Sequence, residues 1–312
     1  MDFLIVDRMH NSLMPMLERI GVRPHYHPDI TRAEIAGQIE QYDGLIVRSK
    51  IFVDEALLTR APRLKYICRA GAGIDNLDVA AIAEKGIEII NAPEGNRNAL
   101  AEHALGLLLA LLNNVVKGDR EVRGFKWDRE GNRGYELSNL KVGIVGYGFM
   151  GSAFADKVKH LAGEVLVYDK YKSGFGDDLV REVGMEEIYE EVDVLSIHIP
   201  LTEETRFMFN SDYFSKFKKP IWLINTSRGE VMSMKTLVDL LKGDLLRGAA
   251  LDVLENEKIN SFTPWERDLF DYLVDCEQVI LTPHVGGWSF ESYQKINEVI
   301  VEKLQMLLPV DN

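Results

Sequence analysis

Short apolar runs and longer amphipathic stretches alternate along the first third of the chain. The apolar runs, rich in β-branched residues, have the length of buried strands, and the stretches between them carry apolar residues at helical spacing. Regular alternation of strands and helices predicts a parallel sheet covered on both faces. The expected strands are Phe3–Val6, Arg23–Tyr26, Gly44–Val47, Lys65–Cys68 and Ile87–Ile90, and the expected helices are Leu13–Ile20, Arg32–Gln41, Asp54–Thr59 and Val79–Lys85. Residues 1–98 are therefore expected to form a flavodoxin-like domain.

A long helix, from about Asn98 to Gly124, precedes a second set of strands. Its segment Ala104–Leu112 is apolar on every side, which predicts burial on every side, by core or by another subunit. The later strands are expected at residues 142–145, 165–168, 193–197, 221–225, 247–251 and 279–281. Six such strands suit a second doubly wound domain over residues 99–285.

The final amphipathic helix, Trp288 to Leu308, must bury its apolar face. We expect it to return to the first domain, so that residues 1–98 and 286–312 form one discontinuous substrate domain. The predicted fold class is α/β, with two doubly wound parallel-sheet domains and a cleft between them.

A glycine-rich loop lies in the middle of the chain, between a strand and a helix expected from Ser152 to about Leu161. It has the spacing G-x-G-x-x-G, in which the first glycine permits a tight turn, the second lets backbone approach a pyrophosphate, and the third allows close helix–strand packing. The next strand ends in an acid that can bond both ribose hydroxyls and repel a 2′-phosphate. Strand, loop, helix, strand and acid in register predict a Rossmann domain that binds NAD rather than NADP. The residues concerned are Gly146, Gly148, Phe149, Met150, Gly151 and Asp169.

Three polar residues follow later strands of the same domain, where open α/β sheets place their ligands. Arg228 can grip a carboxylate with two parallel hydrogen bonds. His284 can take the hydroxyl proton of a hydroxy acid as hydride leaves the same carbon, or return it in the reverse direction. Glu257 can hold the imidazole and favour its charged form. Arg228, Glu257 and His284 are therefore candidate catalytic residues for hydride transfer.

The chain resembles the D-isomer-specific 2-hydroxyacid dehydrogenases, and within them the short form of D-3-phosphoglycerate dehydrogenase. The resemblance covers essentially the whole length and rests on many motifs together. They are Val47-Arg48-Ser49, Arg69 to Asn76, Asn91-Ala92-Pro93, the glycine loop, His198 to Thr202, Asn225 to Gly229, Leu251-Asp252-Val253, Glu257 and Thr282-Pro283-His284.

The resemblance implies roles for further residues. It implies that Arg228, Glu257 and His284 are the catalytic trio, and that the chain forms a homodimer through its cofactor domain. It implies that Asp252 bonds the nicotinamide carboxamide. It assigns His198, Pro200 and Thr226 to the cofactor groove, and Arg48, Ser49, Ala72 and Gly73 to the carboxylate or phosphate of the substrate.

Substrate choice is left open by the residues. Arg48 and Lys50 flank one loop, and Arg129 resembles a position that reaches a neighbouring subunit's site. Three cations in an acidic chain favour 3-phosphoglycerate, the substrate of a step in serine biosynthesis; glyoxylate, hydroxypyruvate or a lactate-like acid is the alternative. Glu257 stands where related formate dehydrogenases have glutamine, which disfavours that reaction. The segment Asn256-Glu257-Lys258 lacks a proline that often follows this glutamate. A remote alternative is an NAD-sensing corepressor-like protein without enzymatic activity.

Composition narrows the partners. The chain has 312 residues, a net charge of −13 and a hydrophobic content of 46%, typical of a globular protein with ample core and unlike a general nucleic-acid or anionic-membrane surface. Its N-terminus has the pattern of a strand rather than a signal peptide, and Ala104–Leu112 falls short of the about 20 apolar residues that span a bilayer, so a cytoplasmic location is expected.

Two minor patterns complete the sequence. Cys68 and Cys276 adjoin apolar segments, so buried free thiols are expected. His25 and His27 have metal-ligand spacing, but only Asp29 stands beside them, so we expect a surface strand end and no metal site.

Overall fold

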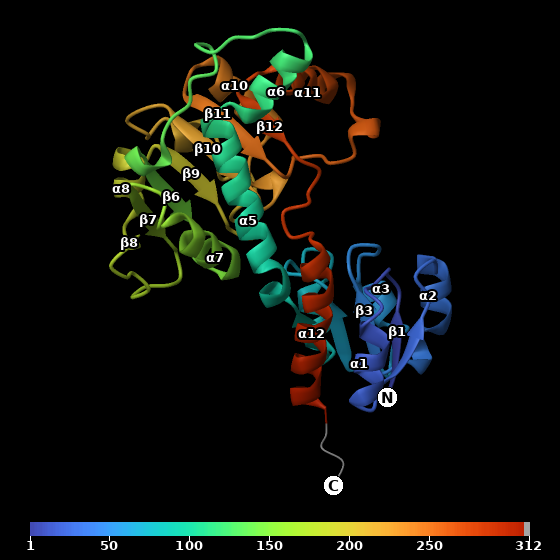
Figure 1. Cartoon of the computed structure of the whole chain (residues 1–312). Helices are drawn as coiled ribbons and strands as arrows, with labels where there is room; N and C mark the ends of the chain where they lie inside the picture. Colours follow the sequence, from blue (N-terminus) through green and yellow to red (C-terminus); the bar gives the residue numbers. More distant parts are fainter. Residues whose placement is uncertain (309–312) are drawn as a thin grey trace. The chain divides into compact units, whose positions relative to one another are not determined.

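The computed structural model describes residues 1–308, and the chain divides into two compact units. The first unit consists of Met1–Arg97 and Trp288–Asn312, of which residues 309–312 lie outside the described part. The second unit is Asn98–Gly287. Each unit is built on one sheet in which all strand pairs are parallel, which confirms the predicted α/β fold class (Figure 1).

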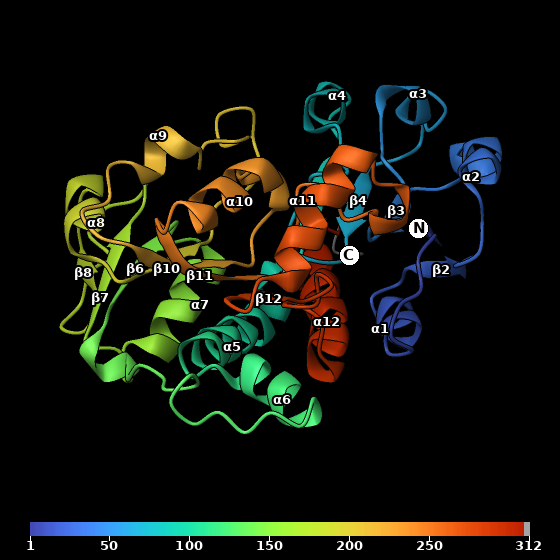
Figure 2. The ribbon, with the colours of Figure 1, turned by 90° about the horizontal axis from the view of Figure 1, so that it is seen from above.

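The first unit has a five-stranded sheet in the order β2-β1-β3-β4-β5, the order of a flavodoxin-like fold. Helices α1 and α12 cover one face of this sheet, and α2, α3 and α4 cover the other (Figure 2). Its strands are β1 (Asp2–Ile5), β2 (Arg23–Tyr26), β3 (Gly44–Val47), β4 (Tyr66–Arg69) and β5 (Glu88–Asn91). Its helices are α1 (Leu13–Arg19), α2 (Arg32–Gln38), the short 3₁₀ turn η1 (Ile39–Gln41), α3 (Glu55–Leu58), α4 (Val79–Glu84) and α12 (Phe290–Leu307).

The last helix belongs to the core of the first unit. Ile296, Ile300 and Leu304 repeat every four residues along α12, so they form one apolar stripe. This stripe packs with Leu13 and Leu17 of α1 over the sheet. Lys303 of α12 ties it further by bonding Asn91 O at 2.9 Å and Glu94 Oε2 at 2.8 Å. The C-terminal segment is therefore held by the domain that contains the N-terminus.

The second unit has a seven-stranded sheet in the order β12-β11-β10-β9-β6-β7-β8. Six of these strands were predicted. The seventh, β8, has only two residues, both charged, so no apolar run marks it. The strands are β6 (Lys141–Val145), β7 (Glu164–Tyr168), β8 (Arg181–Glu182), β9 (Val194–Ile197), β10 (Ile221–Asn225), β11 (Leu246–Leu251) and β12 (Val279–Leu281).

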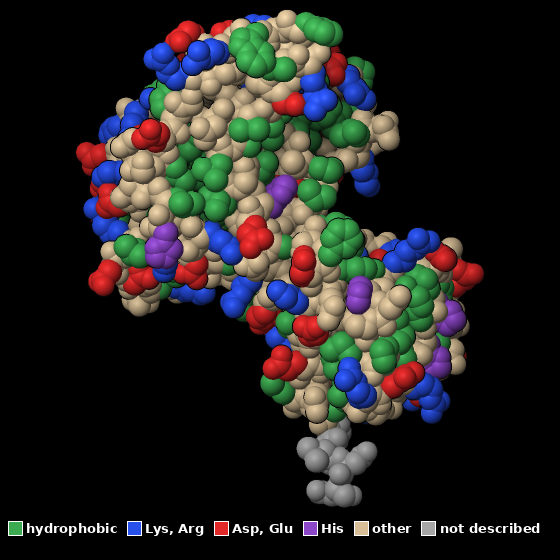
Figure 3. Space-filling view, in the orientation of Figure 1, with side chains coloured by type: hydrophobic (Ala, Val, Ile, Leu, Met, Phe, Trp, Pro, Cys, Tyr) green, Lys and Arg blue, Asp and Glu red, His purple; other side chains and the backbone are tan. Residues whose placement is uncertain are grey.

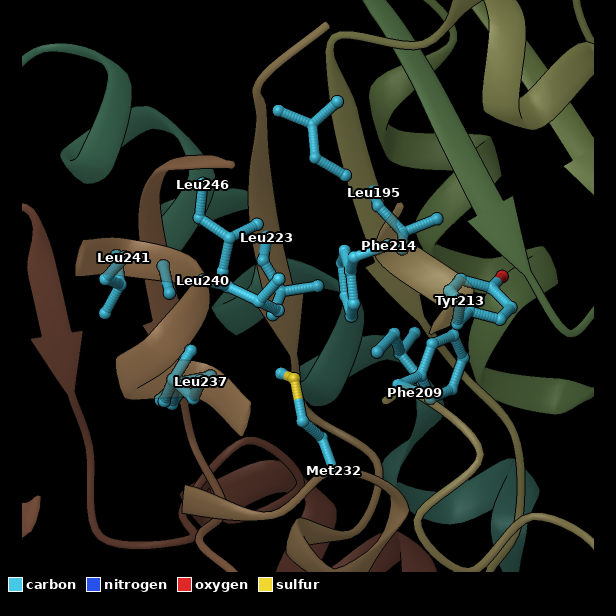
Figure 4. Close-up of a cluster of buried hydrophobic side chains, with 14 of the residues drawn as sticks. Leu195, Phe209, Tyr213, Phe214, Leu223, Met232, Leu237, Leu240, Leu241 and Leu246 are labelled. Atoms are coloured by element: carbon cyan, nitrogen blue, oxygen red, sulfur yellow. The ribbon is translucent and has the colours of Figure 1, made fainter. Parts of the chain in front are cut away.

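Helices cover both faces of this sheet as well. Helices α5 and α7 pack on one face, and α8 to α11 contribute to the core on the other, which includes the aromatic cluster around Phe209 and Phe214 (Figure 4). The helices are α5 (Pro93–Leu112), α6 (Val115–Arg123), α7 (Phe149–Val158), α8 (Met185–Glu191), α9 (Ser211–Phe214), α10 (Met234–Lys242) and α11 (Pro264–Asp275). Short 3₁₀ turns are η2 (Leu137–Asn139), η3 (Gly229–Val231) and η4 (Ile259–Ser261).

The predicted single helix from Asn98 to Gly124 is wrong, because two helices occupy this region. Helix α5 ends at Leu112, and Asn114 adopts a left-handed conformation with φ 52° before α6 begins. Asparagine tolerates this conformation better than most residues do. The core of this chain covers α5 only in part, since Leu105 and Leu109 are half-buried; the predicted burial by another subunit stays a prediction. Within residues 1–308 no single helix is long and apolar enough to cross a membrane; only α5 and α6 together, bent by 61°, meet that test of length and composition.

The two cysteines differ in their surroundings. Burial raises the pKa of the Cys68 thiol to about 12, as expected for an inert core residue. Cys276 is only half-buried, contrary to expectation, because it caps the C-terminus of α11.

Candidate active site

The glycine loop connects β6 to α7, and two of its glycines have no room for a side chain. Gly146 has φ 97°, and a Cβ on it would lie 2.6 Å from the carbonyl oxygen of His198. A Cβ on Gly151 would lie 1.9 Å from the carbonyl oxygen of Gly146, so the first turn of α7 can approach the strand only with glycine there. Helix α7 starts at Phe149, three residues before the predicted start at Ser152. The loop residues Phe149 and Met150 therefore belong to its first turn, whose free N–H groups favour an anion.

The middle glycine differs from the other two. A Cβ on Gly148 would meet nothing within 4 Å, so the protein itself does not exclude a side chain at this position. Open space beside a helix N-terminus is what a pyrophosphate needs in order to approach the backbone closely. The loop therefore fits a dinucleotide, with Gly148 at the point of approach.

Asp169 follows β7 and is fixed by backbone donors. Its Oδ2 accepts a hydrogen bond from Tyr147 N at 2.7 Å, and its Oδ1 accepts from Tyr171 N at 2.9 Å and Lys172 N at 3.0 Å. Burial would raise the pKa of Asp169, but these backbone bonds and the nearby Lys172 outweigh it and lower the pKa below its ordinary value. The carboxylate is therefore a fixed negative charge, suited to ribose hydroxyls and unsuited to a 2′-phosphate.

His198 and Thr226 lie buried at the ends of β9 and β10. His198 bonds Ser196 Oγ through Nε2 at 2.8 Å and packs on Phe154, with ring centroids 5.2 Å apart. Burial lowers its pKa to about 3, so the imidazole is neutral. His198 lies next to the glycine loop, since a Cβ on Gly151 would be 3.3 Å from His198 Cβ. Pro200 follows two residues later in the chain. Thr226 Oγ1 and His198 Nδ1 have no hydrogen-bond partner within residues 1–308, and the Thr226 hydroxyl could serve a cofactor.

Arg228 stands on a turn that Asn225 organises. The Asn225 side chain accepts hydrogen bonds from Ser227 N at 3.0 Å and Ser227 Oγ at 2.8 Å, and donates one to Arg228 O at 3.1 Å. Arg228 Nη1 donates to Ser227 O at 2.7 Å. The half-buried guanidinium is therefore oriented by the chain itself. Asn225 was not predicted as a site residue, and its position at a strand end was the only signal for it.

Glu257 and His284 are joined by their side chains. His284 Nδ1 lies 2.9 Å from Oε1 and 3.0 Å from Oε2 of Glu257, and both side chains are about half exposed. His284 has φ 56°, an uncommon conformation outside glycine, and its N–H bonds Asp252 O at 2.8 Å. Such backbone strain clusters at functional sites. With Nδ1 engaged by the carboxylate, Nε2 is the ring nitrogen left for a substrate.

Asp252 holds the turn that carries His284. Its side chain, 1% exposed, accepts hydrogen bonds from Thr282 Oγ1 at 2.6 Å, Val285 N at 2.9 Å and Gly286 N at 2.7 Å. His103 of α5 lies 3.3 Å from its Oδ1. Burial would raise the pKa of Asp252, but the bonds from His103, Thr282 and the two amides lower it. His103 was missed from the sequence, although a lone histidine in the apolar α5 was its signal.

The predicted substrate residues of the first unit lie in loops after β3 and β4. Asn76 donates to Arg48 O at 3.1 Å and Ile51 O at 3.0 Å, which fixes the first loop and its exposed Ser49. Asn91 donates to Ala72 O at 2.7 Å, which fixes the loop containing Ala72 and Gly73.

Arg48 and Lys50 have different surroundings. The Arg48 guanidinium lies over the ring of Trp288, 4.0 Å from its centroid, and 5.5 Å from that of Tyr293. Lys50 Nζ instead donates to Val6 O at 3.2 Å and Pro28 O at 2.6 Å. Lys50 is therefore committed to the protein backbone, which weakens its predicted role as a phosphate-binding cation.

A family model described as D-isomer specific 2-hydroxyacid dehydrogenase, NAD binding domain, matches residues 105–286. A D-3-phosphoglycerate dehydrogenase from Archaeoglobus fulgidus is 30% identical over 317 residues, which cover 100% of this chain and 59% of that protein. The chain thus spans only about three fifths of that relative. A glyoxylate reductase from Pyrococcus furiosus is 33% identical over 288 residues, with 88% of this chain and 82% of that protein covered.

Solved structures show the same fold. The TT0316 protein from Thermus thermophilus is 29% identical, with a TM-score of 0.83 and coverage of 97% of this chain and 96% of that one. A D-lactate dehydrogenase from Aquifex aeolicus complexed with NAD and lactic acid has a TM-score of 0.83 at 24% identity, with coverage of 98% and 95%.

Proposed function

The chain belongs to the D-isomer specific 2-hydroxyacid dehydrogenase family, with residues 105–286 as its NAD-binding domain, and we propose that it transfers hydride between NAD and a D-2-hydroxy acid. The observation that carries this proposal is the Glu257–His284 pair, 2.9 Å apart, in the same unit as the glycine loop. An imidazole oriented by a carboxylate can act as the general base that removes the proton of a hydroxyl group.

NAD, when bound, accepts hydride from the carbon that bears the hydroxyl group. His284 takes the hydroxyl proton on Nε2 in the oxidation and returns it in the reduction. Glu257 holds the ring through Nδ1 and stabilises the imidazolium that forms. Arg228 binds the carboxylate of the substrate, with its guanidinium oriented by Ser227 O. The roles proposed for Asp169, Thr226 and Asp252 are in cofactor binding.

For the substrate we propose 3-phosphoglycerate, oxidised to 3-phosphohydroxypyruvate as a step towards serine. Support comes from relatives named D-3-phosphoglycerate dehydrogenase, which match 100% and 98% of this chain. Arg48, Ser49, Ala72 and Gly73 are the residues proposed to bind its carboxylate or phosphate group.

One observation favours an unphosphorylated acid such as glyoxylate or hydroxypyruvate as the second candidate. Lys50, one of three cations predicted for a phosphate, donates to two backbone carbonyls instead. Fewer available cations suit a substrate with less negative charge, and a glyoxylate reductase is among the relatives.

We also propose a homodimer and retain the prediction of a cytoplasmic location. Leu105 and Leu109 of α5 are half-buried, and Val122, Phe125 and Trp127 are exposed by 51%, 101% and 78%. A second copy would cover such large apolar side chains. Sedimentation should give twice the mass of one chain; the mass of one chain would refute the dimer.

The reaction is tested with a panel of 2-hydroxy and 2-oxo acids, with and without phosphate, against NAD(H) and NADP(H). The proposal predicts turnover of a D-2-hydroxy acid with NAD, with 3-phosphoglycerate as the preferred member. Preference for glyoxylate or hydroxypyruvate would favour the second candidate. Absence of turnover on the whole panel, together with NADH-dependent capture of another protein, would favour the non-enzymatic NAD sensor.

A further inference from the structure

The segment after Asp169 carries two lysines where a 2′-phosphate would bind. In folds of this type the acid at the end of the second strand bonds the ribose hydroxyls, and a nearby basic residue accommodates the 2′-phosphate of NADP. In this chain Lys170 directly follows that acid, and Lys172 comes two residues later. Their positions alone would favour tolerance of NADP. Whether each lysine can bind a 2′-phosphate then depends on the partners of its side chain.

Both lysines have partners within the second unit. Lys172 Nζ donates to Tyr147 O at 3.0 Å, in the glycine loop itself. Lys170 Nζ forms an ion pair with Glu204 Oε1, and Tyr171 OH donates to Glu204 Oε2 at 2.8 Å. The hydrogen bond to Glu204 raises the pKa of Lys170, and that to Lys170 lowers the pKa of Glu204, so the pair is ionised. Glu204 therefore engages two consecutive residues next to Asp169.

Glu204 is placed by a turn with its own hydrogen bonds. Thr205 Oγ1 donates to Pro200 O at 2.7 Å, and Thr202 N donates to Thr205 Oγ1 at 2.8 Å. This turn follows His198 and Pro200, the residues predicted to line the cofactor groove. The Glu204 carboxylate is therefore carried by a hydrogen-bonded turn.

We propose that Glu204 is a second determinant of the choice of NAD over NADP. It keeps Lys170 paired, so that this cation is withheld from a 2′-phosphate. Asp169 and Glu204 together then exclude a phosphate group of charge about −1.5 to −2. The lysines serve to fix the segment instead of binding the cofactor.

The test measures binding of two nucleotides by calorimetry with the full chain. 5′-AMP carries the adenosine half of NAD, and 2′,5′-ADP adds the 2′-phosphate. Glu204→Gln keeps the size of the side chain and removes its charge, which frees Lys170 for a charge-assisted bond to the 2′-phosphate. The Kd of 2′,5′-ADP should fall about tenfold, and that of 5′-AMP should stay within about twofold.

Two further variants separate a freed lysine from a change in net charge. Glu203, the residue before Glu204, is exposed and has no side-chain hydrogen bond or ion pair within the described residues. Glu203→Gln is therefore the matched control and should leave both Kd values within about twofold. Lys170→Met added to Glu204→Gln should abolish the gain. An unchanged Kd of 2′,5′-ADP in Glu204→Gln, an equal gain in Glu203→Gln, or a gain that survives Lys170→Met would overturn the proposal. The readout needs no turnover and is independent of the substrate.

Discussion

The carboxyl ends of the two parallel sheets carry different kinds of support for their polar residues. In the second unit Arg228, Asp252 and His284 are each positioned by hydrogen bonds, and His284 by a charged partner as well. In the first unit Arg48 has its guanidinium stacked on Trp288 and Tyr293, without a side-chain hydrogen bond or ion pair within residues 1–308. Hydrogen bonds fix direction closely, whereas aromatic faces hold a cation and leave its donors available.

This difference matches a division of labour. Proton and hydride transfer require reacting groups in one geometry, and a displacement of about 1 Å can cost about a hundredfold in rate. Binding a substrate's variable end tolerates more freedom. Under the proposed function, residues of the second unit carry out the reaction and residues of the first unit select the acid. Positive and negative side chains are interspersed over the face in Figure 3, and the net charge of the chain is −13. We therefore expect local groups to bind an anionic substrate.

The largest effect is expected at the carboxyl end of the sheet in the second unit, where hydrogen bonds position the polar residues. His284→Ala removes the proposed acid–base group and should lower kcat by about 10²–10⁴-fold in steady-state assays. His160, an exposed residue two positions past the end of α7, provides the control His160→Ala, which should leave kcat unchanged. Near wild-type turnover of His284→Ala would show that the reaction does not depend on His284.

Two substitutions in the glycine loop should distinguish an effect on folding from an effect on cofactor binding. Gly151→Ala places a Cβ 1.9 Å from Gly146 O, so it should lower the free energy of unfolding by about 1–3 kcal/mol as well as weaken NADH binding. Gly148→Ala meets nothing within 4 Å, so thermal unfolding of the apoprotein should stay unchanged while the Kd of NADH rises about tenfold. Unaltered NADH binding by Gly148→Ala, followed by fluorescence titration, would contradict the proposed point of pyrophosphate approach.

The buried His198 predicts an acid-side loss of stability. Its pKa of about 3 lies below the ordinary value of about 6.5, so between these values only the unfolded chain binds the proton. Stability from this group is therefore complete above about pH 6.5 and declines as pH falls, by about 1.4 kcal/mol at one unit below that value. Denaturant titrations at pH 7.5 and 5.5 should show a smaller decline in His198→Gln than in the wild type. Equal declines would mean that His198 is not held neutral by burial.

The smallest effect is expected in the first unit. Trp288→Ala removes the face under Arg48, worth about 0.5–1 kcal/mol at a partly exposed site, so KM for the substrate should rise about two- to fivefold with little change in kcat. Trp288→Phe keeps an aromatic face and should restore most of the affinity. A fall in kcat without a rise in KM would show that Trp288 acts in the reaction step. The contrast between the carboxyl ends of the two sheets would then not hold.

The sequence predicted both sheets because their strands are buried on two faces and read as continuous apolar runs. It did not predict β8, which consists of two charged residues, or the break at Asn114, where left-handed backbone separates two helices. Glycines 146 and 151 could be assigned because one loop conformation requires them. The contacts of His103 and Trp288 could not, since each depends on which distant segment packs beside it. Those of Asn225 are local, but they depend on the conformation of the turn at Ser227 and Arg228. The roles of the site residues stay predictions.

The most direct test of the central claim follows deuterium from the carbon of the substrate to the cofactor. D-3-phosphoglycerate deuterated at C2 is incubated with NAD and the wild-type chain, beside the L-isomer and the His284→Ala variant. If the second unit performs the proposed reaction, mass spectrometry will find deuterium in NADH from the D-isomer, little from the L-isomer, and a loss of about 10²–10⁴-fold in rate in the variant. Should 3-phosphoglycerate be inert, deuterated D-glycerate and D-lactate test the same claim. Absence of transfer from all three D-acids, or equal transfer from both isomers, would contradict it.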